Sequence, residues 1–136
     1  MQKDFDGWNS KKKQTDAGAE RPAYHTREIW WCALGTNIGS EQDGTGHNFD
    51  RPVVIVRGFN REVCFVVALM GRKRTSPFHF PVGVIEDREA SAILSQVRLL
   101  DTKRLVRKLG TLHIKKFNAL IARLKETLFP NEKVSR

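Results

Sequence analysis

The sequence predicts a mainly β protein in which a small barrel, or a strongly curved antiparallel sheet, is covered on its open side by one C-terminal amphipathic helix. Short apolar segments follow one another with turn residues about every 8–12 positions, which is typical of small barrels and curved sheets. The last apolar segment has helical rather than alternating spacing. With 136 residues, 40% of them hydrophobic, the chain is long enough for one compact domain with a real core.

The first 25 residues are expected to form an N-terminal extension. Residues 4–13 predict a short helix with Phe5 and Trp8 on one side, and residues 16–22 have the composition of a linker. We expect the two aromatic side chains to pack onto the domain. The alternative is that they dock a partner.

Five strands are expected after this extension. The segments are apolar, with β-branched or aromatic residues, and turn signals such as Gly35, Gly58 and Gly71 follow them. Pro81 favours an edge position for the fourth strand, because proline cannot donate a hydrogen bond to a neighbouring strand. The five segments are residues 28–34, 51–56, 62–69, 78–82 and 92–100.

A helix is expected near the C-terminus. Thr111 suits its N-cap, and Pro130 marks its end. Its apolar residues recur at helical spacing, and they are Ile114, Phe117, Leu120, Ile121, Leu124 and Leu128. Its polar face is basic and carries Lys115, Lys116, Arg123 and Lys125.

The charge balance favours a polyanionic partner. The chain has 24 lysines and arginines against 15 acidic residues, a formal net charge of +9. Such a protein suits nucleic acid, an anionic membrane surface or an acidic protein. The alternative is a basic surface that only keeps the protein soluble.

The location is expected to be cytoplasmic, without a membrane partner. The charged N-terminus has no signal-peptide pattern, and no run approaches the roughly 20 apolar residues that cross a bilayer. Cys32 and Cys64 both lie in apolar segments, which favours buried free thiols in a reducing compartment over a disulfide.

Common catalytic and metal-binding motifs are missing from the sequence. It contains neither a P-loop nor the GxGxxG, HExxH or GxSxG patterns. The four histidines lack ligand spacing, so we expect neither a metal ion nor another cofactor. They are His25, His47, His79 and His113.

A long polar connection, GSEQDGTGHNFDRP at residues 39–52, separates two apolar strands and ends with Arg51. Functional residues often lie on loops that a rigid scaffold holds. A guanidinium at this place can bind a phosphate with two hydrogen bonds and stabilise a pentavalent transition state. The alternative is that Arg51 pairs with Glu41 or Asp50 and orders the loop.

Further polar residues have both a functional and a purely structural interpretation. Gln96 and Arg98 fall on one face of the last strand, which indicates either a binding surface or a face that meets solvent. Two basic segments, residues 71–76 and 103–108, are either solvated surface or contacts to a phosphate backbone. Sequence spacing does not decide whether the two segments line one groove.

Two longer segments resemble the MazF/PemK family, the toxins of type II toxin–antitoxin systems. They are REIWWCALGTNIGSEQ…RPVVIV and ILSQVRLLDTKRLVRKLGTL, and an amphipathic helix follows them. The more specific motifs are GSEQ leading to RPVV, and SQVRLLD, which is similar to the family's Q-[IV]-R-x-[IVL]-D strand. The likeness spans about residues 26–129, so a toxin-like domain is expected over residues 26–136.

The resemblance implies an SH3-like small barrel, a homodimer and a metal-independent, sequence-selective endoribonuclease that cleaves single-stranded RNA (mRNA) by attack of the 2′-OH. The products would be a 2′,3′-cyclic phosphate and a 5′-OH, and Arg51 stands at the catalytic position. Ser40 and Gln42 match loop positions that contact RNA in the family, and Gln96 and Arg98 belong to the second motif. The resemblance also implies a cognate antitoxin whose acidic tail occupies the RNA groove.

The sequence departs from the family where the third strand ends. Relatives carry a threonine or serine pair there, whereas this chain has Met70, which cannot hydrogen-bond a phosphate. Either Arg72, Thr75 or Ser76 substitutes, or activity is weak or lost. His47, in a loop longer than the family's compact form, is either a general base near neutral pH or an exposed loop residue.

Two other functions remain open on the same scaffold. One is a catalytically weak or inactive protein that binds RNA or the antitoxin, which Met70 favours. The other is a toxin that inhibits gyrase, because the same small barrel hosts that function as well.

Overall fold

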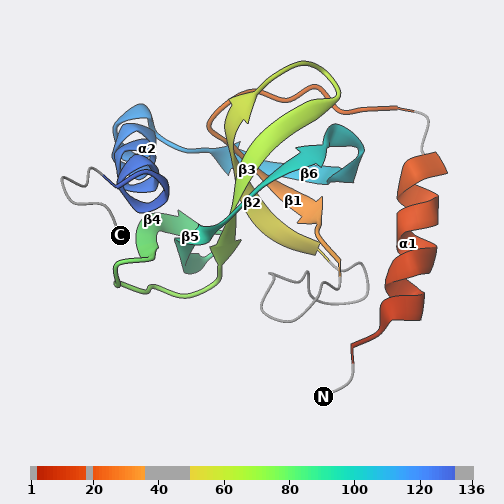
Figure 1. The fold of residues 1–136 in the computed structure, drawn as a ribbon, viewed down its shortest axis with the longest axis horizontal. Helices are drawn as coiled ribbons and strands as arrows, with labels where there is room; N and C mark the ends of the chain where they lie inside the picture. Colours follow the sequence, from red (N-terminus) through yellow and green to blue (C-terminus); the bar gives the residue numbers. More distant parts are fainter. Residues whose placement is uncertain (1–2, 18–19, 36–49, 131–136) are drawn as a thin grey trace.

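A computed structural model describes residues 3–17, 20–35 and 50–130, and in these residues six strands form one sheet with an α-helix on either side (Figure 1). The helices are α1 (Phe5–Ala17) and α2 (Ile114–Leu128), and a short 3₁₀ helix covers Thr102–Arg104. The strands are β1 (Glu28–Ala33), β2 (Asp50–Gly58), β3 (Val63–Met70), β4 (His79–Ile85), β5 (Arg88–Asp101) and β6 (Leu105–Thr111).

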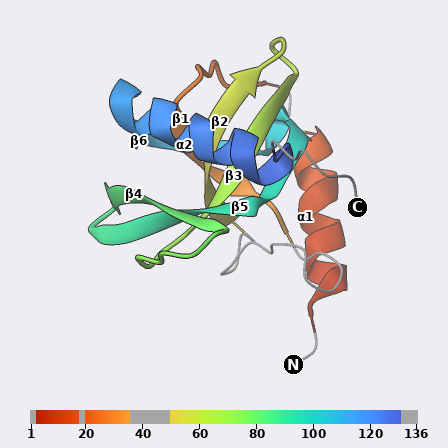
Figure 2. The same cartoon turned by 60° about the vertical axis from the view of Figure 1, so that its left-hand side comes forward.

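The sheet is antiparallel throughout and strongly curved. Its strand order is β4-β5-β3-β2-β1-β6. The curvature brings the two ends of this order together, because Arg107 of β6 donates to Glu86, in the turn between β4 and β5, at 3.2 Å. Figures 1 and 2 show the curled sheet from two sides. The predicted fold class, a curved antiparallel barrel-like sheet with a C-terminal helix, is confirmed.

The central strands are buried on both faces. Val53, Val54 and Ile55 of β2 are each 0% exposed, which explains why three apolar residues stand in a row. Val54 belongs to the core under α2, whereas Val53 and Ile55 belong to a second core on the other face, with both cysteines. The cysteines are free and buried, as predicted. Burial raises the pKa of Cys32 to about 12, so its thiol stays protonated.

Helix α2 covers the first of these cores. Phe117, Leu120 and Leu124 point into it, and Figure 2 shows the helix lying across the sheet. The predicted N-cap is wrong: Thr111 ends β6, and His113 caps the helix by accepting from the backbone N–H of Lys115 at 3.2 Å. An imidazole nitrogen can serve as the acceptor at this place because the N-terminal amides of a helix lack partners within it.

Three strand predictions need correction. Strand β6 is missing from the prediction because its Arg107 and Lys108 were assigned to a basic surface segment. An edge strand tolerates such charges, which discourage pairing with another chain. Strand β5 is longer than predicted, and β4 continues to Ile85, although β4 lies at the predicted edge. The connection between them is a two-residue turn in which Glu86 (φ 50°) and Asp87 (φ 64°) are left-handed.

Helix α1 is fixed to the sheet by one aromatic side chain. Trp8 is 5% exposed and lies against Gly35, which follows β1, whereas Phe5 is 50% exposed. The Arg104 guanidinium lies over the Trp8 ring at 5.6 Å, and Lys103 Nζ donates to the Asp16 carbonyl at 3.0 Å. Only one of the two aromatic residues therefore packs on the domain as predicted. The boundary between an extension and a domain near residue 25 stays a prediction.

Candidate functional site

A groove of about 620 Å³ lies where β2 begins and β3 ends. Every strand of the described sheet contributes to its lining, which becomes possible only because the sheet curls. The lining residues are Trp31, Arg51, Pro52, Met70, Gly71, Arg72, Ile85, Glu86, Arg88, Ala90 and Leu109.

Arg51 is held at the mouth of this groove. It pairs with Cys32 in the β1–β2 register, and its Nη1 donates to the Leu69 carbonyl at 3.1 Å. The side chain is half-buried. This contact orients the guanidinium toward the end of β3. Of the partners predicted for the structural alternative, Glu41 lies outside the described residues.

The neighbour of Arg51 is Asp50, the first residue of β2. Burial raises the pKa of the Asp50 carboxyl, and the nearby ammonium of Lys11 opposes that rise. Lys11 belongs to α1, so this helix contributes positive charge close to the start of β2.

Met70 lies beside Arg51. Val53 of β2 pairs with Ala68 of the antiparallel strand β3. Two residues further, back along β2 and forward along β3, the same register puts Met70 opposite Arg51. Met70 is partly exposed and lines the groove. A thioether offers only a weak acceptor and no donor. The position at which relatives are expected to carry a hydroxyl is therefore inside the groove, and in this chain it is apolar.

Three charged side chains share the groove with Arg51: Arg72, Arg88 and Glu86. Glu86 is the only carboxylate among its described lining residues, and it also accepts from Arg107. The sequence pattern predicts Arg72 at the site, but it does not predict Arg88, Glu86 or the partly exposed Trp31. The available signal was the short acidic turn at residues 86–87, which is typical of a hairpin and would have brought its flanks together.

Thr75 and Ser76 do not line the groove. Ser76 Oγ lies 2.6 Å from His79 Nδ1 and accepts from the Phe78 N–H at 3.1 Å, so it caps the start of β4. Thr75 is exposed. Neither hydroxyl is placed to replace the one that Met70 lacks.

The remaining predicted residues lie elsewhere or outside the described chain. Gln96 and Arg98 are half-buried on β5 and do not line the groove. Burial lowers the pKa of Arg104, and the charge of Arg98 lowers it further, so these two guanidinium groups lie on the same side of the molecule. Ser40, Gln42 and His47 fall outside the described residues. Any role of these five in binding stays a prediction.

The second basic segment, residues 103–108, has structural partners. Lys103 binds the backbone of α1, Arg107 pairs with Glu86, and Lys108 pairs with Glu28 at 3.0 Å. Arg104 is half-buried and donates to the Ala33 carbonyl at 3.3 Å. The two basic segments therefore differ, because the cations of this one hold β6 and α1 in place.

A second hollow, of about 790 Å³, lies at the opposite end of β2 and β3, and Glu20, Arg21 and residues 60–62 line it. Arg21 is paired there with Asp101 and also donates to Thr102 Oγ1 at 3.2 Å. These contacts fasten the segment before β1 to the sheet. Two of its five lining residues are acidic and Arg21 is already paired, so the groove around Arg51, with three arginines and one carboxylate, is the better candidate site for a polyanion.

Metal-binding clusters and membrane-spanning helices are both absent from the part of the chain that the structure places. No cluster of three or more histidine, cysteine or acidic side chains that could bind a metal ion occurs there. None of its helices combines the length and apolar composition that a membrane-spanning helix needs.

One family profile identifies the family of this chain. The profile of the PemK-like, MazF-like toxins of type II toxin–antitoxin systems matches residues 25–128. No curated protein sequence matches the chain.

Several solved structures are similar in fold. An endoribonuclease from a mycobacterial species superposes with a TM-score of 0.62 at 17% identity, covering 84% of this chain and 99% of that one. MazF from Deinococcus radiodurans superposes with a TM-score of 0.63 at 15% identity, covering 81% of this chain and 98% of that one. A mycobacterial endoribonuclease in complex with its cognate antitoxin gives 0.60 at 19% identity, over 78% and 95%.

Proposed function

This chain belongs to the family of PemK-like, MazF-like toxins of type II toxin–antitoxin systems, and from that premise we propose that it is a toxin that cleaves single-stranded RNA internally without a metal ion. The observation that carries the proposal is the position of Arg51, which lines a groove at the start of β2 and donates to the Leu69 carbonyl. The net charge of +9 suits a polyanionic substrate.

The proposed reaction uses a neighbouring hydroxyl of the RNA itself. The 2′-oxygen bonds to phosphorus while the bond from phosphorus to the 5′-oxygen breaks, giving a 2′,3′-cyclic phosphate and a 5′-OH. One proton leaves the 2′-OH, and one is delivered to the departing 5′-oxygen. Between these events the phosphorane carries two negative charges, which cations in a partly enclosed groove stabilise.

Arg51 supplies that electrostatic stabilisation. An arginine guanidinium keeps its charge at neutral pH and is a poor proton donor or acceptor there. Arg72 and Arg88, which line the same groove, bind the adjoining phosphates. Glu86 is the carboxylate within the groove that can accept the 2′-proton, and Arg107 orients it.

We also propose a cognate antitoxin and a homodimer as partners. A structural neighbour was solved together with its antitoxin, and an acidic antitoxin segment would complement the arginines of this groove. A second copy of the chain would extend the groove across a two-fold interface. Gln96 and Arg98, which lie outside the lining described above, are proposed to contact RNA, and the same role is proposed for Ser40 and Gln42.

A catalytically weak binding protein is the second candidate, and Met70 is the observation that favours it. The side chain lies opposite Arg51, and it provides no donor to the phosphate. Such a protein would hold RNA or the antitoxin in the same groove without cleaving it.

One assay separates these functions. Purified protein is incubated with mixed-sequence RNA in EDTA, and the ends of the fragments are mapped. Cleavage that leaves cyclic phosphates and is lost in Arg51→Ala supports the nuclease. Binding without fragments supports the binding protein, and inhibition of DNA supercoiling with intact RNA would favour a gyrase inhibitor.

A further inference from the structure

The loop that follows β3 carries three consecutive cations, Arg72, Lys73 and Arg74, which we name the cationic rim. All three are exposed, and among the described residues none forms an ion pair with a carboxylate. This distinguishes the rim from residues 103–108, whose cations are occupied. Arg72 also lines the groove, so the rim begins inside the candidate site and leads out of it.

The backbone of this loop is fixed although its side chains are exposed. Ser91 is 0% exposed, and its Oγ accepts from the Arg74 N–H at 2.8 Å and donates to the Arg74 carbonyl at 3.4 Å. A buried hydroxyl that satisfies both backbone groups of one residue holds that residue against β5. The cations are thereby presented from a rigid support, which reduces the ordering cost of binding.

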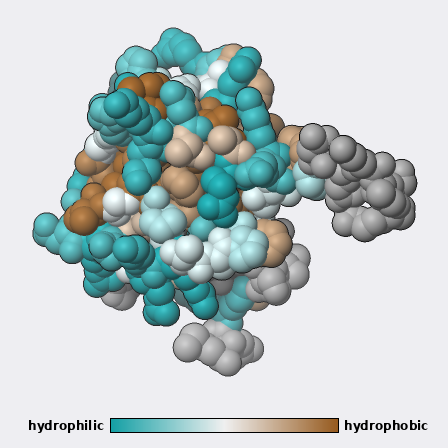
Figure 3. Space-filling model, turned by 90° about the vertical axis from the view of Figure 1, so that its left-hand side faces the viewer, coloured by the Kyte–Doolittle hydropathy of each residue, from teal (hydrophilic) through white to brown (hydrophobic). Residues whose placement is uncertain are grey.

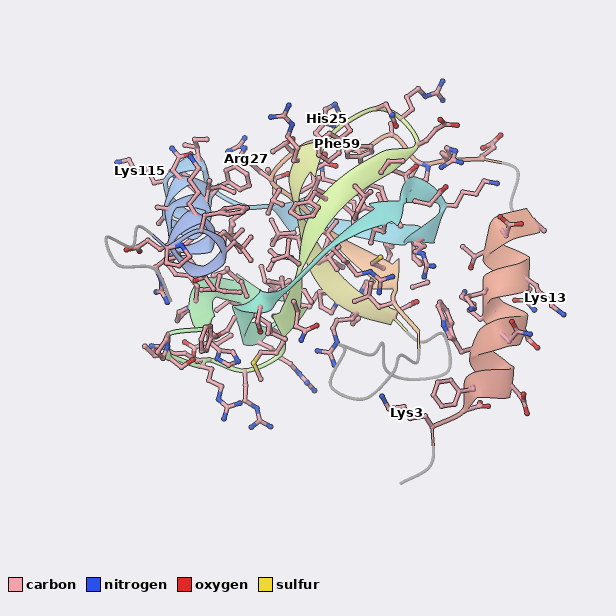
Figure 4. All side chains as sticks on the ribbon, in the orientation of Figure 1. Lys3, Lys13, His25, Arg27, Phe59 and Lys115 are labelled. Atoms are coloured by element: carbon pink, nitrogen blue, oxygen red, sulfur yellow. The ribbon has the colours of Figure 1, made fainter. Side chains whose placement is uncertain are left out.

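The far end of the loop is tied to α2. Arg123 Nη2 donates to the Ser76 and Pro77 carbonyls, at 3.2 Å each. The Arg123 guanidinium and the Lys116 ammonium both lie 5.8 Å from the Phe80 ring centre. Lys115 points away from the sheet on the outer side of α2 (Figure 4). In Figure 1 the loop runs from the end of β3 toward β4, below α2. Positive charge therefore continues from the groove toward α2.

The surface beyond the rim remains largely hydrophilic. Figure 3 looks onto the side of the molecule that carries α2 and β4, where hydrophilic residues surround a smaller group of hydrophobic ones. An apolar partner surface does not fit such a border, whereas a flexible polyanion that follows the cations does.

We propose that the cationic rim is a phosphate track for the nucleotides that flank the cleavage site, so that single-stranded RNA leaves the groove at Arg72 and continues over Lys73 and Arg74 toward α2. The inference rests on the proposed function, since it takes RNA as the ligand of the groove. Contacts of this kind bind the backbone and carry little sequence information. The track therefore adds affinity for longer RNA without restricting the sequence that is cleaved.

The test compares two charge-matched variants. Lys73→Gln/Arg74→Gln removes two cations of the rim, and Arg57→Gln/Arg61→Gln removes two exposed cations at the β2–β3 hairpin, at the opposite end of these strands. The ligands are mixed-sequence 2′-O-methyl RNAs of about 5 and about 15 nucleotides, which span the site sizes of single-strand binders. They lack the attacking hydroxyl, so affinity is measured without cleavage.

The rim variant should bind the longer RNA more weakly and with a salt slope lower by about 1.4, because each single-strand phosphate contact contributes about 0.7. The affinity advantage of the native protein then shrinks about sevenfold between about 50 and 200 mM salt. Affinity for the short RNA should be unchanged, and the hairpin variant should resemble the native protein with both RNAs.

Three outcomes would overturn the track. Equal losses in both variants would show an effect of net charge alone, and equal losses with both RNA lengths would place Lys73 and Arg74 inside the groove. If the rim variant keeps its RNA affinity but no longer binds polyglutamate, a probe for acidic proteins, the rim would be a site for an acidic protein instead. Native protein that binds but never cleaves unmodified RNA would contradict the proposed function, and the RNA-length comparison would still test the track.

Discussion

At the scale of single residues, the site depends on two neighbours with opposite properties. Arg51 presents a charged fork to the groove, and Met70, opposite it, presents an apolar thioether. The contact between Arg51 Nη1 and the Leu69 carbonyl orients the guanidinium toward the end of β3. The guanidinium is therefore positioned at the groove before a substrate arrives.

Replacing Arg51 should remove cleavage and leave the fold intact. Arg51→Ala should lower the cleavage rate by about 100- to 1000-fold, the cost of losing one preorganised donor to a developing anion. The cleavage rate of Arg51→Lys should lie between those of the native protein and Arg51→Ala, because an ammonium keeps the charge but not the forked donors of a guanidinium. Cleavage rates measure the loss of activity, and a cooperative thermal melt shows that the fold is intact. A variant that no longer melts cooperatively would show that Arg51 is structural.

Replacing Met70 with threonine should raise cleavage. A hydroxyl at this position would hydrogen-bond a charged phosphate, which contributes about 1.5–3 kcal/mol, or about 10- to 100-fold in rate. Met70→Leu, which keeps the apolar character, is the matched control and should show no gain. Single-turnover cleavage of one RNA measures all three proteins. An unchanged rate in Met70→Thr would mean that another group already fills this role.

At the scale of secondary-structure elements, α1 is joined to the sheet through a contact that admits only glycine. Gly35 has φ +77°, and a Cβ placed on it would lie 1.9 Å from Trp8 Cε2. The indole thus lies flat on backbone immediately after β1. Arg104 and Lys12 add cation–π contacts to the same ring, at 5.6 Å and 5.9 Å. Lys13 points away from the sheet (Figure 4), so α1 is fastened along one side only.

A double-mutant cycle should show this dependence. Gly35→Ala should destabilise the native protein through both the left-handed backbone and the clash, but in a Trp8→Ala background only the backbone cost of about 1–2 kcal/mol remains. Urea unfolding of the four proteins measures the coupling. Gly83→Ala is the control, because Gly83 has φ +105° and no atom within 4 Å of its added Cβ. Coupling between residues 8 and 83 would contradict the contact-based explanation.

At the scale of the whole molecule, the curved sheet is fastened at its β6 end by a buried carboxylate. Glu28 is 5% exposed and accepts from Trp30 Nε1 at 3.0 Å, and it pairs with Lys108 Nζ of β6 at 3.0 Å. Burial alone would raise its pKa, but the hydrogen bonds from Trp30, Lys108 and His25 lower it from 4.5 to about 2. The side chain therefore holds β6 on the sheet while it is ionised.

This arrangement predicts a loss of stability in acid. The pKa of Glu28 is lower in the folded state, so its contribution is complete above about pH 4.5 and is lost as the pH falls toward 2. Between about pH 4.5 and pH 2, the free energy of unfolding of the native protein should fall by about 2–3 kcal/mol more than that of Glu28→Gln, since each pKa unit corresponds to about 1.4 kcal/mol. Glu126→Gln, on the exposed surface of α2, is the control. Parallel pH profiles of native and Glu28→Gln proteins would refute the assignment.

The sequence by itself determined the features that depend on local pattern. The apolar runs of β1, β2 and β3 and the helical spacing of α2 are long enough to specify their own structure, because their side chains have to be buried on one or both faces. It also placed Arg51 at the beginning of a strand, which is β2. The sequence pattern does not predict strand β6, because Arg107 and Lys108 interrupt its run of apolar residues. Its position is fixed by pairing with β1, a strand far from it in the sequence.

Tertiary structure alone decided which charged groups share the groove. Arg88 and Glu86 come to Arg51 only because the sheet curls until β6 meets the turn after β4. The same curvature leaves Gln96 and Arg98 outside that lining. The two basic segments have similar compositions but different surroundings. The cations of residues 103–108 contact Glu28, Glu86 and α1, whereas those of the cationic rim are exposed. A sequence pattern records which faces are apolar, but it does not record where distant strands bring their polar ends together.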